Sequence, residues 1–147
     1  MRSLTEQLNA LRIPFTFKAL SDPSDYKRND SGTLYFERSK YKIFRQIIQT
    51  VYAENKLYFQ SSVSLFTKLL AAGLSLAEKP EYKETTQERF GLNRYQIVAN
   101  GLLDAWYKED SSPTGRIDAI SQHFSLQGID FQRFYLNPSS QDIYTLL

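Results

Sequence analysis

The chain has 147 residues, of which 41% are hydrophobic and 23% charged, the size and balance of about one folded globular domain rather than of a disordered chain. It contains no cysteine, which excludes disulfides, thiolate zinc sites and a cysteine nucleophile. The net charge of +2 is too small to indicate nucleic-acid binding, and no apolar run has the roughly 18 residues of a membrane span or resembles a signal peptide, so we expect a cytoplasmic protein.

The first part of the chain predicts a short helix followed by a strand. Leucines recur at helical spacing over residues 3–11, and Pro14 then forces an extended backbone. Residues 15–19 alternate apolar and polar side chains, as a half-buried strand does. This alternation places Lys18 on the face opposite two phenylalanines.

A second strand and a longer helix follow. Turn-forming residues over 21–32 separate the first strand from a second one over 33–37. Residues 40–55 place their apolar side chains on one helical face, which predicts an amphipathic helix. Residues 65–70 and 74–77 are apolar, and we expect two short strands there, with a break between them at Gly73.

The last part of the chain predicts two more helices and an irregular tail. The polar residues 79–88 are expected to form a surface loop before a helix over 91–108. Ser112 and Pro113 are the N-cap and first residue of a further helix that Gly128 ends. The aromatic tail is expected to lie on the body of the protein, because its rings would otherwise be exposed to water. The apolar residues expected to be buried on the two helices are Ile97, Val98, Leu102, Ala105, Trp106, Ile117, Ile120 and Phe124.

These elements predict an α+β fold for residues 1–147, with a small antiparallel or mixed sheet packed by about three main helices in a single domain. With one histidine, His123, and no carboxylate-rich ligand loop, a metal site is not expected. Neither a glycine-rich phosphate loop nor a Ser-His-Asp motif is present. No cofactor is therefore expected.

The charge is unevenly distributed, which suits an anionic substrate or partner. Residues 12–68 contain ten Lys or Arg against five Asp or Glu, whereas the rest of the chain contains eight against eleven. Four cations stand in apolar or turn contexts, where a charge is more often partnered or functional than on a polar helix face. They are Lys18, Arg28, Lys68 and Arg94. Converging Lys and Arg bind phosphate or carboxylate, and the alternative is ion pairing to Asp22, Asp30, Glu78 or Glu88.

Four strings of the chain resemble the HopA-type family of type III secretion effectors and its cyanobacterial relatives. They are FTFKALSDPSDYKRNDSGTLYFE at 15–37, LFTKLLAAGLSLAEKP at 65–80, ERFGLNRYQIVANGLL at 88–103 and YLNP at 135–138. The resemblance covers nearly the whole chain and is to the carboxy-terminal portion of longer family members.

The resemblance implies one of two functions. Relatives in class V lanthipeptide biosynthesis are thought to act with a kinase-like partner, which phosphorylates Ser or Thr of a precursor peptide before the phosphate is eliminated. Such a phospho-Ser/Thr lyase needs a base for the Cα proton and cations for the departing phosphate. By match to the family strings, Lys18 or Lys68 is expected to be the catalytic base, Arg28 and Arg94 to bind phosphate, and Asp30 and Tyr35 to orient these groups. The alternative is a noncatalytic effector-type module that binds a peptide or protein.

Overall fold

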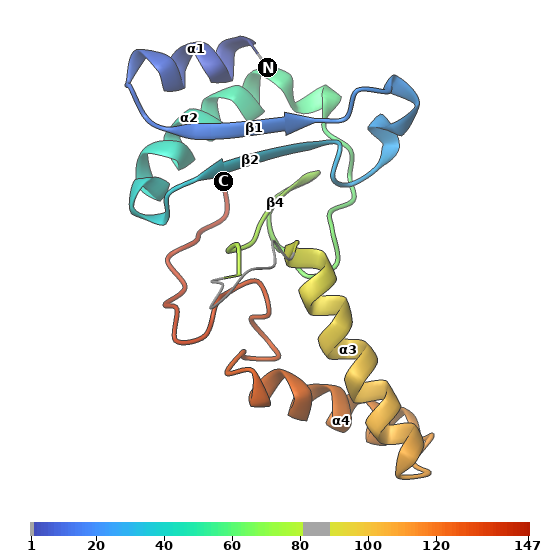
Figure 1. Ribbon diagram of the computed structural model, residues 1–147. Helices are drawn as coiled ribbons and strands as arrows, with labels where there is room; N and C mark the ends of the chain where they lie inside the picture. Colours follow the sequence, from blue (N-terminus) through green and yellow to red (C-terminus); the bar gives the residue numbers. More distant parts are fainter. Residues whose placement is uncertain (1, 81–88) are drawn as a thin grey trace. The chain divides into compact units, whose positions relative to one another are not determined.

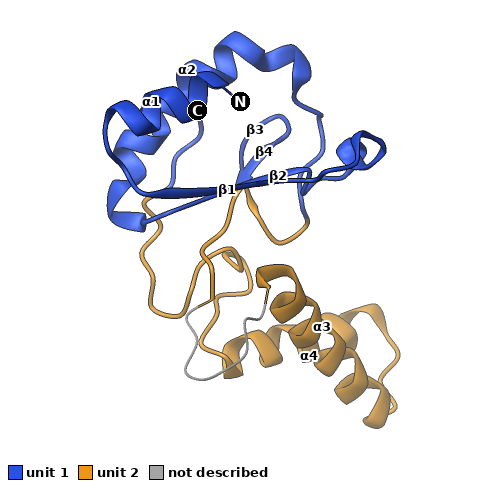
Figure 2. Ribbon diagram, turned by 45° about the horizontal axis from the view of Figure 1, so that its top comes forward, with its two compact units in different colours: residues 1–64, 69–75, 144–147 blue, residues 65–68, 76–143 orange. Residues whose placement is uncertain are grey.

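The computed structural model describes residues 2–80 and 89–147, and the chain divides into two compact units (Figure 2). Unit 1 comprises residues 1–64, 69–75 and 144–147, and unit 2 comprises residues 65–68 and 76–143. Helices occur together with two small two-stranded sheets, which confirms the expected α+β class. Each unit is described by itself below.

Unit 1 is built on two helices and a β-hairpin (Figure 1). The helices are α1 (Arg2–Ala10) and α2 (Tyr41–Asn55), and the antiparallel strands are β1 (Phe15–Ala19) and β2 (Gly32–Phe36). The helices and strands predicted for this part of the chain are confirmed to within a residue or two. Short 3-10 turns precede and follow these elements: η1 (Pro23–Lys27), η2 (Arg38–Lys40) and η3 (Lys56–Tyr58).

One face of the hairpin closes the core of unit 1. Phe15, Leu34 and Phe36 pack against the buried side of α1 and α2, and the Phe36 ring stacks on Phe44 with centroids 4.0 Å apart. The alternation of the strands leaves Lys18 on the opposite, exposed face, as predicted. The buried residues of this core are Leu4, Leu8, Ile13, Phe44, Ile47 and Val51.

A second hairpin consists of β3 (Lys68–Ala71) and β4 (Leu74–Leu76). The prediction of a strand from residue 65 was wrong at its start, because Phe66 is buried in the core of unit 2 and the strand begins only at Lys68. The turn between the strands contains Gly73 with φ +71°, a left-handed conformation that glycine adopts without strain.

Unit 2 is organised by helices α3 (Phe90–Tyr107) and α4 (Pro113–Leu126). The Ser112 hydroxyl accepts a hydrogen bond from the backbone N–H of Gly115 at 3.0 Å, which confirms the predicted N-cap. Past the end of α4, Gly128 has φ +69°. No described helix combines the length and the apolar character of a bilayer-spanning segment.

Two of the side chains expected to be buried on α3 are exposed. Leu102 is 42% and Trp106 is 66% exposed, whereas Ile97 and Ala105 are buried as expected. On α4, Ile117 was also expected to be buried and is 54% exposed, whereas Phe124 is fully buried as expected. The buried stripe of α3 consists of Arg94, Ile97, Gly101 and Ala105.

Close packing of the two helices depends on Gly101. A Cβ atom at this position would lie 2.6 Å from the Ile120 Cα atom of α4, closer than real Cβ atoms approach. We expect Gly101→Ala to lower the free energy of unfolding by about 1–3 kcal/mol, because the helices must separate. Urea denaturation followed by the fluorescence of Trp106, the single tryptophan, measures this. The exposed neighbour provides the control: Asn100→Ala is expected to leave stability within about 0.5 kcal/mol.

The tail from Ile129 to Ile143 has no regular structure and is held to the rest of unit 2 by buried polar groups. The carboxylate of Glu78, 8% exposed, accepts hydrogen bonds from the backbone N–H of Asn137 and from the Ser140 hydroxyl, both at 2.8 Å. Tyr135 is buried in unit 2 and Tyr144 in unit 1, which confirms that tail aromatics pack on the body. The loop predicted over 79–88 lies outside the described residues from residue 81 onward.

Candidate anion-binding site

The four predicted cations divide between the two units. Lys18 and Arg28 lie in unit 1, and Lys68 and Arg94 lie in unit 2. Each therefore has its surroundings in its own unit.

Lys18 lies on the exposed face of the β1–β2 hairpin. It is opposite Thr33 in the strand register, and Tyr35 is its diagonal neighbour on the same face. The Lys18 Nζ atom is 5.3 Å from the centroid of the Tyr35 ring, a cation–π distance. The structure thus brings together two of the predicted site residues on a face directed away from the core.

Arg28 is bound to Asp30 as a two-pronged ion pair. Its Nε and Nη2 atoms are each 2.9 Å from a different carboxylate oxygen of Asp30, and both side chains are about half exposed. The hydrogen bond to Asp30, together with its negative charge, raises the pKa of Arg28 above its ordinary value. Asp30 thus holds the guanidinium plane in one orientation.

The connection that carries Arg28 is fixed to a distant segment of unit 1. The Asn29 side chain donates to the Val63 carbonyl and accepts from the Ser62 hydroxyl at 2.8 Å, and the Gln60 amide donates to the Tyr26 carbonyl. Sequence reasoning missed these contacts, because the polar residues of 60–63 carry no periodic signal. The connection lies at the same end of the hairpin as Lys18, because the backbone N–H of Leu20 donates to the Ser31 carbonyl just beyond the two strands.

Unit 1 has a positive net charge and unit 2 a negative one. It has ten Lys or Arg and six Asp or Glu, net +4, whereas unit 2 has eight and ten, net −2. The uneven charge predicted from the sequence therefore follows the division into units. An anion is attracted to unit 1 in preference to unit 2.

In unit 2, Lys68 belongs to a cluster with two tail residues. Its Nζ atom is 2.6 Å from a carboxylate oxygen of Asp142, to which the Tyr135 hydroxyl donates at 2.5 Å. Burial lowers the pKa of Lys68, but the hydrogen bonds to Asp142 and Tyr135 outweigh it, so that the pKa is raised. Burial and the bond to Asp142 raise the pKa of Tyr135. Both groups therefore keep their protons at neutral pH. Asp142 was missed because 74 residues separate it from Lys68.

Arg94 is buried, with 1% of its surface exposed. Its Nε atom donates to the Phe134 carbonyl at 2.8 Å and its Nη2 atom to the Leu136 carbonyl at 3.0 Å. The remaining guanidinium nitrogen donates to the Asn93 side chain, and the group lies 4.9 Å from the centre of the Phe90 ring. Burial lowers its pKa. In this conformation the side chain binds the tail rather than a surface ligand.

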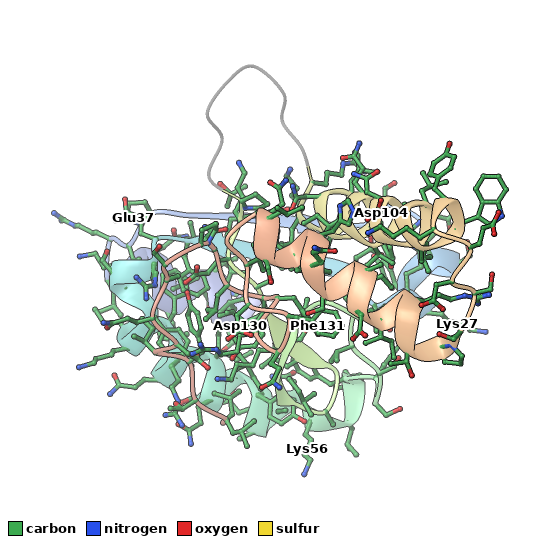
Figure 3. All side chains as sticks on the ribbon, turned by 90° about the horizontal axis from the view of Figure 1, so that it is seen from below. Lys27, Glu37, Lys56, Asp104, Asp130 and Phe131 are labelled. Carbon is green, nitrogen blue, oxygen red and sulfur yellow. The ribbon has the colours of Figure 1, made fainter. Side chains whose placement is uncertain are left out.

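His123 lies beside a carboxylate of the other helix. Its Nε2 atom is 3.6 Å from Asp104, which is labelled in Figure 3 and also accepts a hydrogen bond from Lys108 at 2.9 Å. The contact between His123 and Asp104 joins α4 to α3, whereas Lys108 directly follows α3 itself.

A comparison with protein-family models matches residues 1–136 to the HopA1 effector protein family. The match covers both hairpins, both long helices of unit 2 and the tail as far as Leu136. A search of curated proteins finds no match.

Proposed function

The chain belongs to the HopA1 effector protein family, and on this premise we propose that it binds a phosphorylated Ser or Thr segment of a peptide or protein partner. The observation that carries the proposal is the end of the β1–β2 hairpin, where Lys18 is exposed and Arg28 is held in one plane. An ammonium group and an oriented guanidinium suit the three oxygens of a phosphate. The partner of such a protein is a peptide or protein that a kinase-like enzyme has phosphorylated, in the bacterial cytoplasm or, after secretion, in a host.

The positive charge of unit 1 supports this assignment. The net charge of +4 draws a dianionic phosphoryl group toward the unit before contact. The hydrogen bonds between residues 26–29 and 60–63 keep the connection ordered, so that little conformational freedom is lost on binding.

Removal of either cation is expected to weaken phosphopeptide binding. We expect Lys18→Ala and Arg28→Ala each to raise the dissociation constant of a phosphothreonine peptide by roughly 5- to 20-fold, since each removes a charge-assisted hydrogen bond. Fluorescence anisotropy of the full chain measures this. Lys56→Ala is the matched control, because its side chain is exposed in the same unit and projects from the ribbon in Figure 3.

The unphosphorylated peptide provides the second control. Its affinity is expected to be lower than that of the phosphopeptide. None of the three substitutions is expected to change that affinity. Equal affinity for both peptides would contradict the proposal.

A second candidate function is elimination of the phosphate, and the cluster of Lys68, Tyr135 and Asp142 favours it. A base takes the Cα proton, a Cα–Cβ double bond forms, and the Cβ–O electrons leave with the phosphate. Because its pKa is raised, Lys68 keeps its proton and is not suited to be the base, and we propose that it stabilises the departing phosphate. Mass spectrometry of the same phosphopeptide decides between the functions. Loss of phosphoric acid supports a lyase, and an intact peptide supports a noncatalytic module.

A further inference from the structure

An exposed apolar stripe runs along α3 on the side opposite to the residues that pack against α4. Its large members are between 42% and 66% exposed. A helix that is apolar on both sides is typical of a helix buried between two partners. Among the described residues, α4 covers only one of these sides. We call the exposed residues Leu92, Tyr95, Ala99, Leu102, Leu103 and Trp106 the outer stripe.

The outer stripe is large enough for a specific interface. Its two aromatic side chains are more than half exposed, and with three leucines they present on the order of 500 Å² of apolar surface. Burying this area on each of two copies removes about 1,000 Å² from water in total, near the lower size of a biological interface.

The spacing of the outer stripe fits another helix. Leu92, Tyr95, Ala99, Leu102 and Trp106 are separated by alternating steps of three and four residues, the pattern by which helices pack against helices. Ala99 is small and lies at the middle of the stripe, so that the backbone of a second helix can approach closely there.

The charges around the stripe favour a second copy in antiparallel orientation. The stripe contains no charged residue, while Arg89 precedes α3 and Glu109 and Asp110 follow it. In an antiparallel pair, Arg89 of one copy lies at the level of these two carboxylates of the other. A parallel pair instead places the like charges of both copies together.

We propose that the outer stripe of α3 binds a second copy of this chain, so that two α3 helices pack antiparallel about a two-fold axis. In this arrangement Tyr95 of one copy faces Trp106 of the other, and Ala99 faces Leu102. Large side chains thus meet across the axis in two equivalent places, as an isologous interface requires. A pocket of about 160 Å³, lined in part by Trp106 and Arg116, lies beside the stripe of each copy. It has room for part of the Tyr95 ring of the other copy.

Sedimentation velocity of the full chain over a range of concentrations tests the proposal. We expect a dimer with a dissociation constant in the micromolar range or below. Trp106→Glu is expected to raise this constant by at least about 30-fold, because it removes the largest apolar side chain of the stripe and puts a charge into the interface. Leu57→Glu, at a 98% exposed position of unit 1, is expected to leave it unchanged.

A charge exchange tests the antiparallel orientation. Arg89→Glu is expected to weaken the dimer several-fold, and adding Glu109→Arg is expected to restore it. Restoration does not follow from a parallel pair, in which the two residues lie at opposite ends.

Cysteine cross-linking provides a measurement that does not depend on a disruptive substitution. The chain has no cysteine, so a single Ala99→Cys gives one unambiguous site close to the axis. A short bis-maleimide is expected to cross-link this variant into a dimer faster than Asn100→Cys, which is exposed on the same helix but lies off the stripe. A chain that stays monomeric at about 100 μM, well above the expected range, or a dimer that Trp106→Glu leaves intact, overturns the proposal.

Discussion

Replacing Arg94 by methionine is expected to lower the free energy of unfolding by about 3–5 kcal/mol. The substitution leaves the carbonyl oxygens of Phe134 and Leu136 without the donors that bind them in the interior. Methionine fills part of the volume of the arginine side chain, so that little of the lost stability comes from an empty cavity. Most of it comes from the missing hydrogen bonds to a charged group. Urea denaturation followed by the fluorescence of Trp106, which lies on the same helix, reports the stability of unit 2 directly.

Two controls separate this structural role from a role in binding phosphate. Arg116→Met removes an exposed guanidinium from α4 and is expected to change stability by less than about 0.5 kcal/mol. Arg94→Lys keeps the charge but loses the planar fork, and is expected to lie between the two. If Arg94→Met unfolds at the same urea concentration as the natural chain but no longer binds phosphopeptide, Arg94 is a ligand residue instead.

Local patterns in the sequence were sufficient to predict most of the elements. The alternation around Lys18 predicted its exposure, because strand geometry alone puts neighbouring side chains on opposite faces. The Ser112 cap was predictable because its hydrogen bond reaches only three residues along the chain. Ion pairing of Arg28 with Asp30, one of the two alternatives, is also local.

Features that depend on distant contacts were not predictable. The sequence indicated that Arg94, next to Phe90, had a partner or a function, but its partners are backbone carbonyls about forty residues away, which no side-chain pattern identifies. The strand expected from residue 65 starts late because Phe66 packs on Phe134, with ring centroids 5.5 Å apart. Trp106 was expected to be buried because it shares a helical face with Val98 and Leu102, but apolar residues also lie on other faces of α3. Periodicity therefore could not identify the packed side.

Gly73 in unit 1 also depends on a contact with a residue distant in the sequence. A Cβ atom there would lie 1.9 Å from the Gln60 carbonyl oxygen, and φ is +71°, which disfavours any other residue. We expect Gly73→Ala to destabilise the protein by about 2–4 kcal/mol, measured by thermal unfolding followed by circular dichroism. The adjacent Ala72 carbonyl accepts a hydrogen bond from Tyr52 at 3.0 Å, so that the turn has little freedom to move away.

Gly73→Ala is also expected to affect the proposed phosphate site. Gln60 donates to the Tyr26 carbonyl in the connection that carries Arg28, so displacing Gln60 disturbs the segment that orders this cation. The phosphopeptide affinity of the folded variant is therefore expected to fall, although Gly73 itself carries no side chain.

Gly91→Ala is the matched control, because a Cβ atom there meets only the flexible Tyr95 ring at 3.8 Å and alanine favours the helix. It is expected to keep or raise stability and to leave phosphopeptide affinity unchanged. A Gly73→Ala protein that melts and binds like the natural chain would show that Gln60 does not lie against this turn.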